Sequence, residues 1–185
     1  TRMIELQYLI NMSRQGFVDL HSHSTASDGT LAPSEIVALA ESMPLAALSI
    51  TDHDTIAGQR EAMSAAKTIE YIPGVEVSTD YSKGMLHILG YYIDIDHAEL
   101  AAKLEFFREG RNVRNRQIIA KLNELGMSIT LDEVLAIAGD GVPGRPHLAR
   151  VLLETGQVKS LQEAFDKYLK KGKPAYFQRG KLLPD

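Results

Sequence analysis

The stretch FVDLHSHSTASDGT, residues 17–30, begins as a strand pattern and runs directly into two histidines. Successive side chains of a strand point to opposite faces, so residues two apart point the same way. His21 and His23 therefore present both imidazoles to one side at the end of a strand. Asp28 follows five residues after His23 and adds a carboxylate. Two histidines in this spacing are often only surface side chains, so the rest of the chain has to decide between the two interpretations.

A histidine or a carboxylate recurs at each of the next three strand patterns. These residues are Asp52, His53 and Asp54 after the second pattern, Glu76 within the third and His87 within the fourth. Asp52 to Asp54 are also compatible with a capped turn, and His87 with a core histidine. A glutamate inside an apolar strand is harder to explain, because buried Glu is rare unless it is paired or bound to metal. Together the four positions predict one metal site at the carboxyl ends of neighbouring strands.

The candidate ligands are imidazoles and carboxylates, and the chain contains no cysteine. Donors of this kind suit Mn²⁺, Fe²⁺ or Zn²⁺. The six candidates are too many for one ion. We therefore expect two or three divalent ions, with Glu76 bridging two of them.

The first half of the chain alternates between strand and helix patterns. Strand patterns lie at 17–20, 45–51, 71–79 and 84–94, and helix patterns at 30–42 and 56–69. This order predicts an α/β layer or barrel with a largely parallel sheet. Helix patterns then follow one another at 97–126, 131–139, 146–156 and 160–172. They predict a small helical module that is inserted into the α/β unit or appended to it.

Composition limits the possible partners and locations. The 185 residues carry a formal net charge of −4, which argues against bulk electrostatic binding to duplex DNA or to an anionic membrane. A small phosphorylated substrate remains compatible, because bound metal ions reverse the local field. The sequence has no apolar run of transmembrane length, and residues 1–16 lack the features of a signal peptide. We interpret residues 1–16 as a leader and expect a cytoplasmic protein, whose oligomeric state stays open.

The motifs HSHSTASDGT, TDHDT and PGVE, together with His87, resemble the polymerase-and-histidinol-phosphatase (PHP) family of metallophosphoesterases. GRPHLARVLLETG at 144–156 and YLKKGKPAYF at 168–177 resemble the helical insert of one branch of that family. This branch includes nucleoside 3',5'-bisphosphate phosphatases and 5'-to-3' exoribonucleases. The resemblance implies a distorted (β/α)7 TIM-like barrel with an inserted helical module and a trinuclear site, usually loaded with manganese.

The resemblance also implies a division of the chain. Residues 17–96 would form the N-terminal part of the barrel, 97–172 the helical insert and 173–185 the return to the barrel. The family supplies further ligands after the insert, a His and an Asp-x-His, whereas no histidine follows His147 here. We therefore expect the chain to cover only part of the barrel of a longer enzyme.

Carried over from the family, His21 and His23 would bind one metal, and Glu76 would bridge it to a second metal held with His87. Asp28 and His53 would hold the third. Asp52 and Asp54 are the candidates for orienting the metal-binding histidines. The implied reaction is phosphoester hydrolysis by a metal-bridging hydroxide.

Substrate recognition is expected from the helical module. Arg111, Arg114 and Arg116 lie in one predicted helix, and Arg145 and His147 lie in a turn before another. Arginine binds phosphate oxygens in pairs, and helix N-termini favour anions. His147 is the candidate to contact a phosphate or to protonate the leaving oxygen. These cations favour a nucleotide with a second phosphate or a short 5'-phosphorylated RNA, although arginines on a helix can also form a merely solvated face.

Two alternatives remain. One is histidinol-phosphate hydrolysis, which the arginine-rich insert disfavours. The other is a non-catalytic PHP module within a larger assembly, which the presence of all six candidate ligands disfavours.

Overall fold

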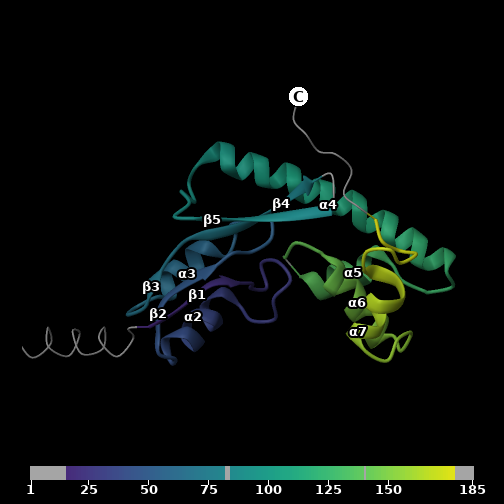
Figure 1. Cartoon of the computed structure of the whole chain (residues 1–185), viewed down its shortest axis with the longest axis horizontal. Coiled ribbons are helices and arrows are strands. Elements are labelled where there is room, and N and C mark those ends of the chain that lie inside the picture. Colours follow the sequence, from purple (N-terminus) through teal and green to yellow (C-terminus); the bar gives the residue numbers. More distant parts are fainter. Residues whose placement is uncertain (1–15, 82–83, 140, 178–185) are drawn as a thin grey trace, which may run out of the picture.

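The computed structural model describes residues 16–81, 84–139 and 141–177. The predicted leader therefore lies almost entirely outside the described residues, as do residues 178–185 of the predicted return to the barrel. Strands with two short helices occupy one end of the molecule, and a group of helices occupies the other (Figure 1). One long helix, α4 (Ala98–Glu124), runs along both parts.

The N-terminal residues form a three-stranded parallel sheet in the order β1 (Phe17–Ser22), β2 (Leu45–Ile50), β3 (Glu70–Tyr71). The helices α2 (Pro33–Glu41) and α3 (Gln59–Ala65) connect these strands. Parallel neighbours need such crossovers, because a short turn cannot return the chain to the same end of the sheet. The predicted alternation of strand and helix is confirmed over this region.

The first core cluster lies between this sheet and its two helices. It consists of Val37, Ala40, Leu48, Ile50, Ala62 and Ile69. The last four residues of β2 are all buried, as its continuous apolar run predicts for a parallel strand. This packing sets the position at which the segment after β2 leaves the sheet.

The helix α3 is shorter than the predicted 56–69, because it ends at Ala65. The backbone N–H groups of Lys67, Thr68 and Ile69 donate to the carboxylate of Glu41 at the end of α2. These amides therefore have partners without continuing the helix.

The prediction of a largely parallel sheet is wrong for the next two strands. β4 (Gly74–Tyr81) and β5 (Gly84–Tyr91) pair antiparallel, because only two residues separate them. The predicted single strand 71–79 is interrupted at Pro73, between β3 and β4. Proline has no N–H to donate to a ladder, so it separates the two strands.

Among the described residues, the strands do not close into the predicted barrel. In the described part of the chain, one isolated parallel bridge, between His53 and Glu76, joins the backbone of the segment after β2 to the β4–β5 ribbon. Two backbone hydrogen bonds make this bridge: Asp54 N–H donates to the Glu76 carbonyl at 2.9 Å, and Glu76 N–H donates to the Asp52 carbonyl at 3.2 Å. The bridge places β4 beside the polar segment that follows β2.

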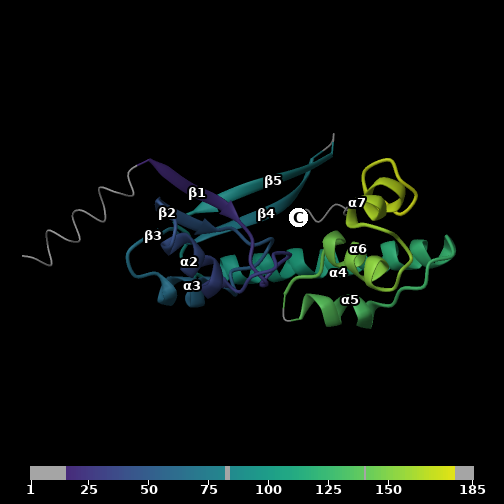
Figure 2. The ribbon, with the colours of Figure 1, turned by 90° about the horizontal axis from the view of Figure 1, so that it is seen from below.

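The C-terminal helices pack around the second half of α4 (Figure 2). They are α5 (Leu131–Ala138), α6 (Arg145–Glu154), α7 (Leu161–Ala164) and the π-helix Phe165–Leu169. The predicted helix 160–172 is thus two shorter elements. Their shared core cluster comprises Ile118, Ile119, Leu122, Ile129, Val134, Leu148, Ala149, Val151, Leu152, Val158, Ala164, Leu169 and Ala175. The predicted boundary between the barrel part and the helical insert, near residue 97, stays a prediction. The two separate core clusters support it.

None of the helices in the described part of the chain combines the length and the apolar character needed to span a membrane.

Candidate metal centre

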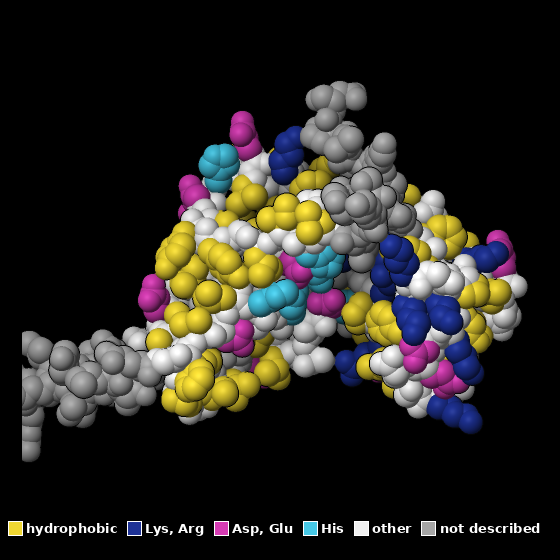
Figure 3. Space-filling model, in the orientation of Figure 1, with side chains coloured by type: hydrophobic (Ala, Val, Ile, Leu, Met, Phe, Trp, Pro, Cys, Tyr) yellow, Lys and Arg dark blue, Asp and Glu magenta, His cyan; other side chains and the backbone are white. Residues whose placement is uncertain are grey.

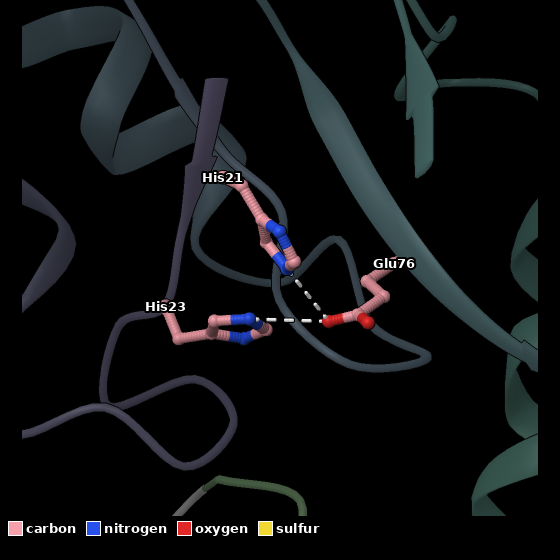
Figure 4. Close-up of side chains that lie close together, drawn as sticks. All are labelled: His21, His23 and Glu76. Atoms are coloured by element: carbon pink, nitrogen blue, oxygen red, sulfur yellow. Dashed lines mark hydrogen bonds and ion pairs between the residues drawn. The ribbon is translucent and has the colours of Figure 1, made fainter. Parts of the chain in front are cut away.

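Four histidines converge on the carboxylate of Glu76, which is 3% exposed. Its Oε2 lies 3.2 Å from His21 Nε2, 3.1 Å from His23 Nε2 and 3.2 Å from His53 Nδ1. Its Oε1 lies 2.6 Å from His87 Nδ1. Figure 4 shows His21 and His23 pointing from one strand end toward this carboxylate. The alternation of side chains along β1 therefore does bring both imidazoles to one side.

The predicted site at the carboxyl ends of the strands holds for two of these residues, because His21 and His53 lie at or after the carboxyl ends of β1 and β2. Glu76 and His87 lie within β4 and β5, as the sequence suggested, but not at the carboxyl ends of these strands. In the antiparallel ladder Ser78 pairs with His87, so Glu76 and His87 are diagonal neighbours within reach of each other. The parallel bridge to His53 then brings this pair to the end of the parallel sheet.

Asp28 completes the cluster. Its Oδ1 lies 3.5 Å from His23 Nδ1, and its Oδ2 lies 3.8 Å from His53 Nε2. Donor atoms within 4.8 Å of one another form three groups: His21, His23 and Glu76; His23, Asp28 and His53; and His53, Glu76 and His87. The structure thus brings together all six residues that the sequence suggested as metal ligands.

The donor set fits divalent metal ions. His53 Nδ1 is buried and makes no hydrogen bond within the described structure, although it lies 3.2 Å from Glu76 Oε2. Burial, followed by the positive charges of Arg111 and the other histidines, lowers the pKa of His53 to about 2. A neutral imidazole is the form that binds a metal, and a buried carboxylate among imidazoles needs a cation.

Asp52, the candidate for orienting a metal-binding histidine, reaches one only through a serine. The backbone N–H and the hydroxyl of Ser24 donate to its carboxylate at 2.7 and 2.6 Å. The hydroxyl of Ser27 donates to it at 2.6 Å. Ser27 Oγ in turn lies 3.4 Å from His23 Nδ1. The sequence interpretation missed both serines, although they stand in the loop that follows the histidine pair.

Asp54 anchors an arginine. This residue is fully buried and adopts a left-handed backbone conformation with φ of 53°. Its carboxylate accepts from the Nε of Arg111 at 2.5 Å and from the backbone N–H of Ser78 at 2.9 Å. Arg111 Nη2 also donates to Ser78 Oγ. Arg111, expected to bind substrate, is therefore already engaged in an ion pair that joins α4 to the strands.

A cavity of about 140 Å³ lies beside the cluster. Its polar lining consists of Asp28, His53, His87, Arg111, Arg114 and Arg145. Arg145 also stacks over the ring of Tyr176, with 4.7 Å between the guanidinium carbon and the ring centroid. Burial lowers the pKa of Arg145, although an arginine remains cationic at neutral pH. Three of the four predicted arginines thus line one cavity with three candidate ligands.

Arg116 does not belong to this group. It is exposed on α4, whereas Arg111 and Arg114 are buried. Five residues after Arg111, its side chain is rotated by about 140° around the helix, at roughly 100° per residue. The prediction that it binds substrate is therefore not supported by its position.

His147 lies three residues after Gly144, the N-cap of α6, and is 7% exposed. Its Nδ1 accepts the backbone N–H of Gly144 at 2.9 Å. Burial lowers the pKa of His147, although the negative charge of Asp28 opposes this shift. His147 lines a second and larger cavity of about 510 Å³, with Thr25, Ala26 and Ile137 among its walls.

Histidine and carboxylate side chains gather on the face where the strand region meets the helical region (Figure 3). Lys and Arg side chains of the helical region lie across the hollow from them. The arrangement pairs a cluster able to hold cations with cationic side chains able to hold anions.

Comparisons with known proteins agree with this geometry. Residues 19–177 match the family described as PHP domain. The chain is 42% identical over 160 residues to a 5'-3' exoribonuclease of Haemophilus influenzae, covering 85% of this chain and 58% of the relative. It is 40% identical over 162 residues to a 3',5'-nucleoside bisphosphate phosphatase of Chromobacterium violaceum, covering 86% of this chain and 57% of the relative.

A solved structure has a similar fold. It is described as an amidohydrolase from Chromobacterium violaceum with bound sulfate and no metal. Its TM-score to this chain is 0.81 at 39% sequence identity, covering 88% of this chain and 58% of that chain. The chain therefore spans less than two thirds of the length of the relatives it matches.

Proposed function

Because the chain belongs to the PHP domain family, we propose that it is a metal-dependent phosphoesterase acting on nucleotides. The proposed reaction converts a nucleoside 3',5'-bisphosphate to the 5'-nucleotide, with short 5'-phosphorylated RNA as a related substrate. One observation carries the proposal: Glu76 and five other candidate ligands cluster beside a cavity that is also lined by three arginines. The activities named for the two curated relatives support this substrate class.

The proposed ligands divide among two or three ions, with Mn²⁺ preferred and Fe²⁺ or Zn²⁺ as alternatives. His21 and His23 would share one ion with Glu76, which would bridge to a second ion with His87. Asp28 and His53 would hold the third. When bound, divalent ions lower the pKa of water and offset the charge of phosphoryl oxygens.

The arginines of the small cavity would hold the substrate phosphate that is not hydrolysed. Arg114 and Arg145 are the proposed contacts, because guanidinium groups match phosphate oxygens in pairs. Arg111 would mainly fix the wall of the cavity, since Asp54 already balances its charge.

His147 would serve as a hydrogen-bond donor. Its Nδ1 accepts from Gly144, so the neutral ring carries its proton on Nε2. The lowered pKa of His147 favours this neutral form at pH 7. We therefore propose that His147 donates Nε2–H to a substrate oxygen, which is a narrower role than protonating the leaving group. The cytoplasmic location stays a prediction.

The first experiment measures phosphate release by the Mn²⁺-loaded protein. The substrates are adenosine 3',5'-bisphosphate, 5'-AMP, a short 5'-phosphorylated RNA and histidinol phosphate, and the control is His53→Ala. We expect the 3'-phosphate of the bisphosphate to be released at least about 100-fold faster by the wild type than by the control. Turnover of histidinol phosphate alone would favour a histidinol-phosphate phosphatase. If no substrate releases phosphate while Mn²⁺ is bound, the proposed function is contradicted.

A further inference from the structure

Ser27 stands between a candidate metal ligand and a buried carboxylate. Its Oγ lies 3.4 Å from His23 Nδ1 and 2.6 Å from Asp52 Oδ1. Ser27 is 1% exposed and Asp52 is fully buried. The three groups therefore form a hydrogen-bonded series, Asp52–Ser27–His23, whose first two members are shielded from water.

The hydrogen-bond donors and acceptors of Asp52, Ser27 and His23 determine where each proton lies. A serine hydroxyl has one proton, and an ionised carboxylate only accepts. The hydroxyl of Ser27 donates its proton to Asp52, so its oxygen can only accept from His23. The hydroxyl of Ser24 also donates its proton to Asp52, to the other carboxylate oxygen. His23 must then carry a proton on Nδ1.

This count matters because His23 belongs to two candidate ligand groups. Its Nε2 lies 3.1 Å from Glu76 Oε2, on the side of His21. Its Nδ1 lies 3.5 Å from Asp28 Oδ1, on the side of His53. A neutral imidazole has one lone pair on nitrogen and binds one metal through it.

We propose that Ser27 and Asp52 are positioning residues that hold the proton of His23 on Nδ1. His23 then binds metal through Nε2, together with His21 and Glu76, and contributes no ligand atom to the group of Asp28 and His53. Partners behind a ligating histidine commonly fix its tautomer and ring orientation in this way. The inference rests on the metal site proposed above, but it does not depend on which phosphoester is cleaved.

The direct test is the tautomer of His23 in the Zn²⁺-loaded protein, for which Zn²⁺ is a diamagnetic probe. Long-range ¹⁵N–¹H correlation spectra of the wild type report which ring nitrogen carries the proton and which binds the ion. We expect a protonated Nδ1 and a metal-bound Nε2. A metal-bound Nδ1 would overturn the proposal whatever the protein hydrolyses.

Variants separate positioning from mere structural support. Ser27→Ala removes the acceptor of His23, so Zn²⁺ affinity at one site should fall by about 10- to 100-fold. Ser27→Thr keeps a hydroxyl and should restore most of this affinity. Ser24→Ala is the matched control, because it removes a buried hydroxyl from the same carboxylate, whereas its side-chain partners are Asp52 and the backbone of Ala26.

Calorimetric titration of Zn²⁺ into the three metal-free variants gives the affinities, and thermal unfolding checks that each variant folds. Equal affinities for Ser27→Ala and Ser24→Ala would contradict the proposal, because Ser27 would then contribute only to packing. If Ser27→Ala does not fold, the wild-type spectrum still decides the question. Failure of the proposed function would show instead as metal binding and the expected tautomer without phosphate release.

Discussion

The ion pair between Arg111 and Asp54 shows how one buried contact determines the role of a residue. Arg111 lines the cavity beside the metal cluster, yet two of its nitrogens donate to Asp54 and Ser78. A buried charge without its partner is costly, whereas an exposed charge is not. Arg111 and Arg116 lie on the same helix, but Arg111 is buried and Arg116 is exposed. Variants of the two can therefore be compared directly.

We expect Arg111→Ala to lower the free energy of unfolding by about 3–5 kcal/mol, because it leaves Asp54 buried without its cation. Urea unfolding at pH 7 measures this change. Arg116→Ala is the control and should change the free energy by less than about 0.5 kcal/mol. Similar values for the two variants would mean that the buried pair does not stabilise the fold.

At the scale of elements, Glu41 joins the end of α2 to the segment that leads into β3. Burial alone would raise the pKa of its carboxyl, but the Thr68 hydroxyl and the N–H groups of Thr68, Ile69 and Lys67 outweigh burial. Together they lower the pKa to about 2 from an ordinary value of 4.5. A depressed carboxyl pKa stabilises the folded state above the unfolded pKa and loses this effect as the pH falls toward the folded pKa.

Glu41→Gln should therefore be less stable than the wild type by about 1–2 kcal/mol at pH 7. The difference should stay constant down to about pH 4.5 and shrink as the pH falls from there toward 2. Urea unfolding across this pH range measures it, with the exposed Glu109→Gln as control. A difference that does not change with pH would show that the hydrogen bonds do not depend on the charge of Glu41.

The linker between α5 and α6 packs on the loop that follows β1. Val142 N–H donates to the Ala26 carbonyl at 3.1 Å. A side chain at Gly141 would place its Cβ 2.4 Å from the Thr25 carbonyl oxygen, which is backbone and cannot easily move. The helical region thus contacts the same loop that carries Ser27 and Asp28.

Gly141→Ala should destabilise the protein by about 1–3 kcal/mol, because the added methyl group forces the two loops apart. Gly90→Ala is the control, since its Cβ would meet Val75 Cγ1 at an ordinary 3.6 Å. Thermal unfolding with a calorimeter compares the two. If Gly141→Ala proves as stable as the control, the linker is not held tightly against the loop.

Across the whole molecule, the metal cluster joins segments that are far apart in the chain. Its ligands come from β1, the loop after β1, the segment after β2, β4 and β5. Any ion that binds only the folded chain stabilises it by mass action. The second core cluster, around α4 to α7, contains none of these ligands.

Adding Mn²⁺ at about 100 times its dissociation constant should raise the free energy of unfolding by about 2.7 kcal/mol per site, and chelation should reverse the change. Glu76→Gln should lose most of this gain, because Glu76 belongs to two of the three ligand groups. Urea unfolding with and without Mn²⁺ measures both effects. An equal gain in the variant would place the bound ions elsewhere.

The local parts of the fold could be predicted because they depend on neighbours in the sequence. The buried run of β2 and the shared face of His21 and His23 follow from the alternation of a strand. The element boundaries that were predicted wrongly depend on distant partners. At the end of α3, for example, the Glu41 carboxylate accepts hydrogen bonds from backbone N–H groups that would otherwise have continued the helix. The antiparallel pairing of β4 and β5 was recoverable from the short connection between them.

The amino-acid sequence alone determined which residues can hold metal, since donor type and strand alternation are local properties. It also led to the PHP family through three motifs and His87. Only the tertiary structure decided that Glu76 meets four histidines. It also decided that Asp54 forms an ion pair with Arg111 and that Ser27 connects Asp52 to His23. These contacts join residues whose distances depend on strand pairing and helix packing across the whole chain, and no local pattern encodes them.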